Sequence, residues 1–143
     1  MYKRQDICQL IIDENIDGII ATNTSLDRLG FEQRKIKQTG LLLSEENGGL
    51  SGKPLQQKAN RIIRHIHNID NNINLIGVGG IDSPESAWER ICSGASLVQI
   101  YTGWIYKGPK LVPNILNGII KQIKIHQLSN IREAIGSKLE WIE

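Results

Sequence analysis

The sequence is short of cysteine and has no long apolar run. Its two cysteines, Cys8 and Cys92, lie far apart and in none of the spacings that bind metals or form redox pairs. We therefore expect buried free thiols in a reducing compartment rather than a disulfide. No apolar stretch approaches the length that crosses a bilayer, and the N-terminus lacks the apolar core of a signal peptide. The expected location is the cytoplasm, with no insertion of this chain into a membrane.

An excess of one charge is also missing. The chain has 17 lysines and arginines against 15 aspartates and glutamates, a net charge of +2. Charges of both signs are interspersed, so we expect no basic surface for nucleic acid or for an anionic membrane. The 143 residues allow one domain with a real core but not two sizeable ones, and 40% hydrophobic residues are typical of a soluble globular protein.

What the sequence does contain is an alternation of helical and strand patterns. Short, continuous apolar runs predict strands buried on both faces, at residues 18–23, 74–80 and 96–101. Apolar residues at helical spacing predict helices at about residues 3–14, 54–69, 84–93, 111–125 and 130–139. An alternation of this kind indicates a parallel sheet with crossover helices.

Single residues refine the predicted helices. The first helix should turn Ile7, Leu10 and Ile11, with Cys8 beside them, toward the core. Ser83 is expected to cap the third predicted helix, because its hydroxyl can accept a hydrogen bond from an N–H group of the first turn.

A long loop, from about Leu26 to Lys53, separates the first strand from the second helix, which Pro54 is well placed to open. Loops of this size in a compact domain are usually functional lids or disordered segments. The predicted strands are too few for a closed (β/α)₈ barrel, which needs about 250 residues. The pattern therefore predicts either a β/α fragment or an unusually small α/β protein, as one domain over residues 1–143.

Polar residues and glycines cluster at the C-terminal ends of all three predicted strands. The three groups are Thr22-Asn23-Thr24, Gly79-Gly80 and Tyr101-Thr102-Gly103. In parallel α/β folds, ligands bind at the carboxyl ends of the strands, where these groups would meet. Gly79 and Gly80 could let backbone N–H groups approach a phosphate, or they could simply make a tight turn. The spacing alone leaves both alternatives open.

Asn23 offers a donor and an acceptor at the end of the first predicted strand, and Thr24 adds a hydroxyl. Such a pair suits a planar ligand with imide and carboxylate groups. The alternative is that Asn23 only caps the turn.

Two nucleotide-binding motifs can be excluded. Residues 48–54 superficially resemble a P-loop, but Pro54 stands where a Ser or Thr would hold magnesium. Residues 77–82 carry Asp82 where the third glycine of a dinucleotide fingerprint belongs. The histidines offer no shared metal site, so we predict no metal ligands.

Four segments in the right order resemble the C-terminal part of quinone-linked (class 2) dihydroorotate dehydrogenases. They are residues 20–28 (IATNTSLDR), 48–55 (GGLSGKPL), 76–81 (IGVGGI) and 94–103 (GASLVQIYTG). The similarity extends over nearly the whole chain. It implies the C-terminal portion of a (β/α)₈ TIM barrel, with about three parallel strands and their helices.

The resemblance also implies a function and a site. The family's flavoproteins use FMN to oxidise dihydroorotate to orotate in de novo pyrimidine biosynthesis and pass the electrons to a membrane quinone. By this resemblance, the residues that match flavin-binding positions are Thr22, Gly52, Gly80, Tyr101 and Thr102. Asn23 and Thr24 match positions that bind orotate.

The earlier strands of the family's barrel have no counterpart in this sequence. In the family that portion carries the serine base that removes the substrate proton, a flavin-contacting lysine and the helices of the quinone entrance. We therefore expect no catalytic base in this chain, which alone should be inactive or nearly so. The complete enzyme is expected to be peripheral on the inner side of a membrane. Residues 29–47 form a longer segment than is usual in the family.

A second hypothesis is a non-catalytic half-barrel that self-associates or binds a complementary chain. It is motivated by the sheet edges that an incomplete barrel leaves exposed.

Overall fold

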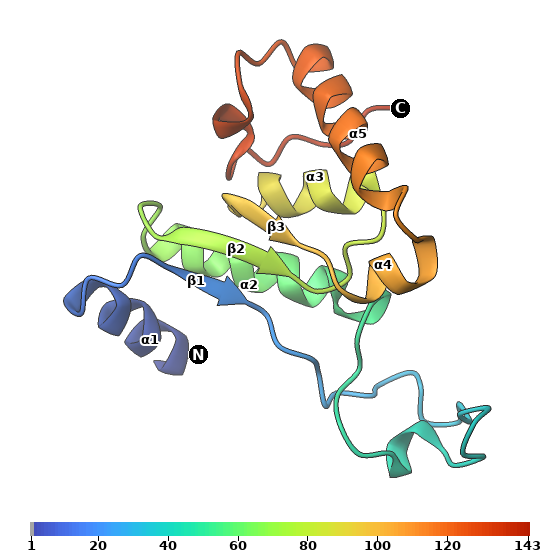
Figure 1. The fold of residues 1–143 in the computed structure, drawn as a ribbon. Helices are drawn as coiled ribbons and strands as arrows, with labels where there is room; N and C mark the ends of the chain where they lie inside the picture. Colours follow the sequence, from blue (N-terminus) through green and yellow to red (C-terminus); the bar gives the residue numbers. More distant parts are fainter. Residues whose placement is uncertain (1) are drawn as a thin grey trace.

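A computed structural model describes residues 2–143 and shows a parallel sheet backed by helices (Figure 1). Within these residues the elements in chain order are α1 (Tyr2–Asp13), β1 (Gly18–Ala21), α2 (Gln56–Ile69), β2 (Asn74–Val78), α3 (Pro84–Cys92), β3 (Leu97–Gln99), α4 (Thr102–Lys107) and α5 (Leu111–Ile125). Short 3₁₀ turns add η1 (Leu43–Glu45), η2 (Lys53–Leu55) and η3 (Ile131–Ala134).

The sheet has three strands in the order β1-β2-β3, and all are parallel. Ile20 pairs with Ile76, and Ile76 pairs with Leu97, so these three side chains share one face. All three strands point the same way, which brings their carboxyl ends to one edge (Figure 1). The predicted parallel sheet with crossover helices is confirmed.

Local sequence signals explain where the helices begin. The Ser83 hydroxyl accepts a hydrogen bond from the N–H of Ser86 at 3.1 Å, so the predicted cap of α3 is confirmed. Pro54 lies in η2, which leads directly into α2. In α2, Ala59, Ile63 and Ile66 recur at helical spacing and are buried.

Helices α2 and α3 cover one face of the sheet (Figure 1). Leu75 of β2 points to this face and is fully buried. The core beneath α2 consists of Cys8, Ile11, Ala21, Ile63, Ile66, Ile73, Leu75 and Ala95. A second layer joins α3 to α5 and to the C-terminal segment around Trp88, Ile91, Cys92 and Ala134. Cys8 and Cys92 are both buried free thiols, as predicted.

The prediction that the strands are buried on both faces is wrong. Ile20 is 60% exposed and Leu97 is 62% exposed, although both are apolar residues within strands. The reason is that α2 and α3 lie on only one side, and no element of residues 2–143 covers the other. We call this second side of the sheet, marked by Ile20, Ile76 and Leu97, the open face.

The first helix also differs from its prediction. Cys8 and Ile11 are buried, but Ile7 and Leu10 are 48% and 53% exposed. Helix α1 packs against α2 along a narrow strip, so Ile7, Leu10 and Ile12 stay outside the core.

The predicted helix at 130–139 is wrong, because only the turn η3 forms. Gly136 and Lys138 adopt positive φ angles of 70° and 61°, which a right-handed helix cannot contain. The six-residue helix α4 was not predicted, since it is too short to show helical spacing.

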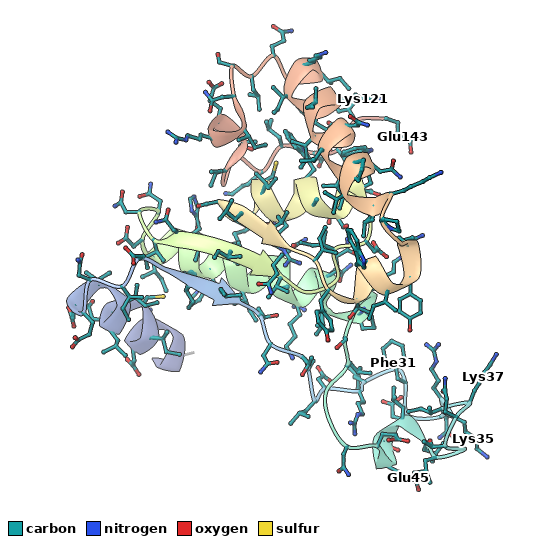
Figure 2. The ribbon with its side chains drawn as sticks, viewed as in Figure 1. Phe31, Lys35, Lys37, Glu45, Lys121 and Glu143 are labelled. Atoms are coloured by element: carbon teal, nitrogen blue, oxygen red, sulfur yellow. The ribbon has the colours of Figure 1, made fainter. Side chains whose placement is uncertain are left out.

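The long loop is an ordered arm, which we define as residues 26–50. Its base is held by an antiparallel bridge between Ser25 and Leu50. The Arg28 guanidinium donates hydrogen bonds to the carbonyl oxygens of Ser44, Glu46 and Gly48 at 3.1, 2.7 and 2.6 Å. The arm projects from the carboxyl edge of the sheet (Figure 1). Figure 2 shows Phe31, Lys35, Lys37 and Glu45 on the projecting part.

Within residues 2–143, every helix is too short or too polar to cross a lipid bilayer.

Candidate functional site

A cavity of about 180 Å³ lies at the carboxyl ends of the three strands. All seven residues that the sequence singled out for flavin or orotate line it: Thr22, Asn23, Thr24, Gly52, Gly80, Tyr101 and Thr102. They come from four separate stretches of chain, so their convergence is a property of the fold. The structure therefore brings the candidate residues into one site.

The end of β1 is tied to the neighbouring strand. The N–H of Thr22 donates to the carbonyl oxygen of Val78 at 3.0 Å. The Asn23 carboxamide oxygen accepts from the N–H of Thr24 at 2.7 Å, so Asn23 does cap its turn. A ligand would therefore meet the amide NH₂ group of Asn23, together with the Thr24 hydroxyl.

Glycines allow three backbone segments to meet in the site. Gly52, Gly79 and Gly80 have φ angles of 77°, 109° and 79°, a region that favours glycine. A Cβ atom at Gly80 would lie 2.8 Å from the backbone nitrogen of Gln56, and one at Gly52 would lie 3.3 Å from Thr102. Gly79 and Gly80 bend the chain after β2 and bring it beside the start of α2, and phosphate binding at this bend stays a prediction. A helix N-terminus carries partial positive charge, which favours an anion.

The third strand leads into α4 through residues 100–101. Gly103 is buried against the backbone of Ile81, which brings the start of α4 beside the Gly79–Gly80 turn. Tyr101 lines the cavity, although the residue is 74% exposed.

A wider cavity of about 780 Å³ adjoins the site and shares Gly52, Gly80 and Thr102 with it. Part of the arm lines this cavity, which the sequence had not indicated. Its basic residues are Arg34, Lys35, Lys37, Lys53 and Lys107, against the single acidic residue Asp82. The charge on this side of the site therefore suits an anionic group.

Arg90 is a residue that the sequence reasoning missed. It belongs to α3, is fully buried, and lies behind the Gly79–Gly80 turn. Burial lowers the pKa of its guanidinium to about 10. An arginine on an amphipathic helix usually faces solvent, so nothing in the pattern around residue 90 distinguished it.

The chemistry of the smaller cavity is that of binding. None of its lining residues within the described chain is Asp, Glu, His, Lys or Cys. The polar groups on offer are hydroxyls, amides and backbone atoms: Thr22, Asn23, Thr24, Ser51, Gln99, Tyr101 and Thr102. They can orient a ligand by hydrogen bonds.

Comparison with known proteins decides the family. The family model described as "Dihydroorotate dehydrogenase" matches residues 2–123. The chain belongs to the dihydroorotate dehydrogenase family. Among curated relatives, the "Dihydroorotate dehydrogenase (quinone)" of Prochlorococcus marinus (strain MIT 9313) is 54% identical over 136 residues, which cover 94% of this chain and 35% of the relative. The protein of the same name from Nostoc punctiforme is 46% identical over 136 residues, 94% of this chain and 36% of the relative.

Solved structures agree with this assignment. A crystal structure of DHODH from Eimeria tenella in complex with ferulenol matches with a TM-score of 0.80 and 27% identity, over 95% of this chain and 35% of that one. The resemblance to quinone-linked dihydroorotate dehydrogenases and the predicted part of a TIM barrel are therefore confirmed. The chain spans about 35% of the length of the relatives that it matches.

Proposed function

We propose that this region of the dihydroorotate dehydrogenase family forms part of an FMN and orotate site, in an enzyme that oxidises dihydroorotate and passes the electrons to a quinone. The observation that carries the proposal is the convergence of seven candidate residues on one cavity at the strand ends. By the same proposal the chain acts in the cytoplasm, and the complete enzyme lies on the inner side of a membrane.

The site fits FMN because its polar groups are hydroxyls, amides and backbone atoms, which can form hydrogen bonds with a flavin and its phosphate. Glycine at Gly80 and Gly52 lets the chain pass close to Gln56 and Thr102, which brings these backbone segments together around the cavity. Backbone at Gly52, Gly80 and Thr102 would hold the phosphate end, and Thr22 would contact the flavin. When bound, FMN supplies the hydride acceptor for the reaction.

The size of the cavity sets a limit on this role. At about 180 Å³ it is smaller than the roughly 300–1,000 Å³ typical of ligand pockets. The described residues therefore enclose part of the ligands, and the adjoining wider cavity gives room for the phosphate end.

Asn23 and Thr24 are proposed to bind the pyrimidine. The Asn23 side-chain oxygen is already engaged with the Thr24 N–H. The group left for a ligand is therefore the amide NH₂, which can donate to a carbonyl or carboxylate oxygen of orotate. The Thr24 hydroxyl adds a second contact. Both side chains are exposed at the strand end.

We propose that the base that removes the proton of dihydroorotate lies outside residues 2–143. The family's serine base is expected in the earlier part of the barrel, and this chain spans only about 35% of the relatives that it matches. Loss of a general base typically costs a factor of about 10²–10⁴ in rate. We therefore expect binding without efficient turnover from this chain alone.

The test is a titration of the purified chain with FMN, followed by flavin fluorescence, and then addition of dihydroorotate under anaerobic conditions. We expect saturable FMN binding, orotate binding that Asn23→Ala weakens, and little bleaching of the flavin. Ser129→Ala is the matched control, because Ser129 lies in the C-terminal segment and does not line the cavity. Absence of any FMN binding would overturn the binding role, and rapid bleaching would overturn the external base.

One observation favours the second candidate, a half-barrel that associates with another chain. The open face exposes Ile20 and Leu97, and an apolar groove of about 620 Å³ continues from it toward α5. Single strands at both edges of the sheet, β1 and β3, also keep unpaired backbone groups. Size-exclusion chromatography with mass analysis tests this candidate, and a stable monomer at high concentration would count against it.

A further inference from the structure

We propose that Arg90 is a positioning residue, which orients the Gly79–Gly80 peptide toward the ligand cavity and fixes it against the start of α2. This inference rests on the proposed function, because it concerns the same cavity. It assigns a role to a side chain that does not itself line the site.

The contacts of Arg90 converge on the parts that build the cavity. Its Nη1 donates to the carbonyl oxygen of Val78 at 2.9 Å, and its Nη2 donates to that of Gly79 at 2.7 Å. The same Nη2 reaches the carbonyl oxygen of Gln56 at 3.3 Å, and Nε donates to the Asn60 side-chain oxygen. One guanidinium therefore joins the end of β2, the glycine turn and the first half of α2.

Because the peptide group is planar, holding its carbonyl oxygen also fixes the direction of its N–H group. The Gly79 carbonyl and the Gly80 N–H belong to one peptide unit, which is trans here. In a trans peptide the C=O and N–H point in opposite directions. Because Arg90 holds the oxygen on the buried side, the Gly80 N–H faces the opposite side, where Gly80 lines the cavity. Among the hydrogen bonds of the described residues outside helices and strands, none uses this N–H.

A purely structural role does not require a charged group at this place. All four acceptors of Arg90 are neutral, and none of its hydrogen bonds goes to a carboxylate. Burial of a charge is costly, the Glu89 carboxylate offsets it only through a nearby charge, and an apolar side chain usually fills such a space at least as well. What the guanidinium adds is a rigid fork of donors that fixes several carbonyl groups at once.

The neighbouring sequence makes room for this fork. A side chain at Gly77 would overlap the aliphatic carbons of Arg90, so glycine in the middle of β2 lets the arginine cross beneath the strand. Glycine weakens a strand interior and is often found where another group must approach closely. Gly77 and Arg90 therefore form one arrangement directed at the turn.

The experiment compares three variants of the full chain. Arg90→Met removes the charge and the donors at similar length, Arg90→Lys keeps the charge, and Arg64→Met is the matched control. Arg64 lies on α2, donates only to the Ser93 hydroxyl at 3.2 Å, and does not line the cavity. Circular dichroism checks the fold, FMN titration measures affinity, and amide hydrogen exchange follows residues 79–82 against helix α5.

We expect Arg90→Met to weaken FMN binding about tenfold or more, since it leaves buried carbonyl groups without donors. Exchange should rise selectively at residues 79–82 and remain unchanged in α5. Arg90→Lys should recover part of both losses, and Arg64→Met should change affinity less than about twofold.

Each outcome bears on one claim. If the unmutated chain binds FMN and a folded Arg90→Met variant binds equally well, the inference fails and the proposed function stands. If the unmutated chain binds no FMN, the proposed function fails, and exchange at the turn alone decides the positioning role. If Arg90→Met does not fold, the Arg90→Lys variant tests the inference in its place. Unchanged FMN affinity and unchanged exchange at residues 79–82 in Arg90→Lys would overturn the inference.

Discussion

The two faces of the sheet both carry apolar residues, but these residues are buried on one face and exposed on the other. Leu75 on the helix-covered face is fully buried, whereas Leu97 on the open face is 62% exposed. Both lie in short apolar strands that the sequence does not distinguish. The difference shows that apolar composition indicates a surface suited to packing. Whether that surface is buried depends on which other elements are present. The candidate site lies at the edge that these two faces share.

The largest expected effect compares the same substitution on the two faces. Leu75→Ala should lower the free energy of unfolding by about 2–5 kcal/mol, because it leaves a cavity in the core. Leu97→Ala should change it by less than about 0.5 kcal/mol, because that side chain is already mostly in water. Urea unfolding followed by circular dichroism measures both. Equal losses would show that the open face is covered in solution.

A charged residue introduced on the open face separates the effect on folding from the effect on association. Leu97→Asp should leave the free energy of unfolding nearly unchanged, but it should weaken any association through this face at least about tenfold, since a carboxylate would be buried without a partner. Analytical ultracentrifugation over a range of concentrations measures the association. The idea that the open face mediates association is wrong if the variant and the unmutated chain assemble equally.

The next prediction concerns FMN binding at the carboxyl edge of the sheet, where Gly80 lines the cavity. Gly80→Ala should weaken FMN binding roughly tenfold, because Ala strains a positive φ of 79° and its Cβ would press on Gln56. Gly108→Ala is the control, since Gly108 has a similar φ of 70° but open space around it. Isothermal titration calorimetry gives both affinities. Similar losses in the two variants would mean that backbone strain, not the cavity, explains the effect.

The smallest expected effect concerns pH. Burial raises the pKa of the Cys8 and Cys92 thiols above the ordinary value. The folded state then holds these protons more tightly, so their contribution to stability is present below a pH of about 8.5 and is lost as the pH rises. The free energy of unfolding should fall slightly as the pH rises above about 8.5, where the thiols of the unfolded chain lose their protons.

Cys92→Ala should make this fall shallower, while Leu97→Cys on the open face should not make it steeper. The same urea series at several pH values decides the matter. A slope that Cys92→Ala leaves unchanged would contradict the assignment of the effect to the buried thiol.

Much of the fold was predictable because its signals are local. The caps and spacings around Ser83 and in residues 54–69 act within a few residues, and the helices formed where these signals placed them. The candidate site was predictable for a related reason, since parallel strands bring their carboxyl ends together regardless of loop length. The roles of Thr22, Asn23 and the other lining residues in binding ligands stay predictions.

What the sequence could not show depends on distant partners. The exposure of Ile20 follows from the absence of a covering layer within residues 2–143, which no local spacing reports. The order of the arm comes from Arg28 reaching carbonyl groups 16 to 20 residues away. Arg90 likewise acts across about 30 residues of sequence, on Gln56 and Asn60.

The spatial order of the strands equals their order along the chain. Within residues 2–143 each strand therefore emerges next to the strand made just before it, and these two pairings need no strand from outside this range. Gly18 of β1 nevertheless lies opposite Asn74 of β2, and pairing over such a long separation in a parallel sheet forms slowly. The nascent chain can still grow by adding one strand–helix unit at a time. In such stepwise growth, the pairing of β1 with β2 does not depend on the later pairing of β2 with β3.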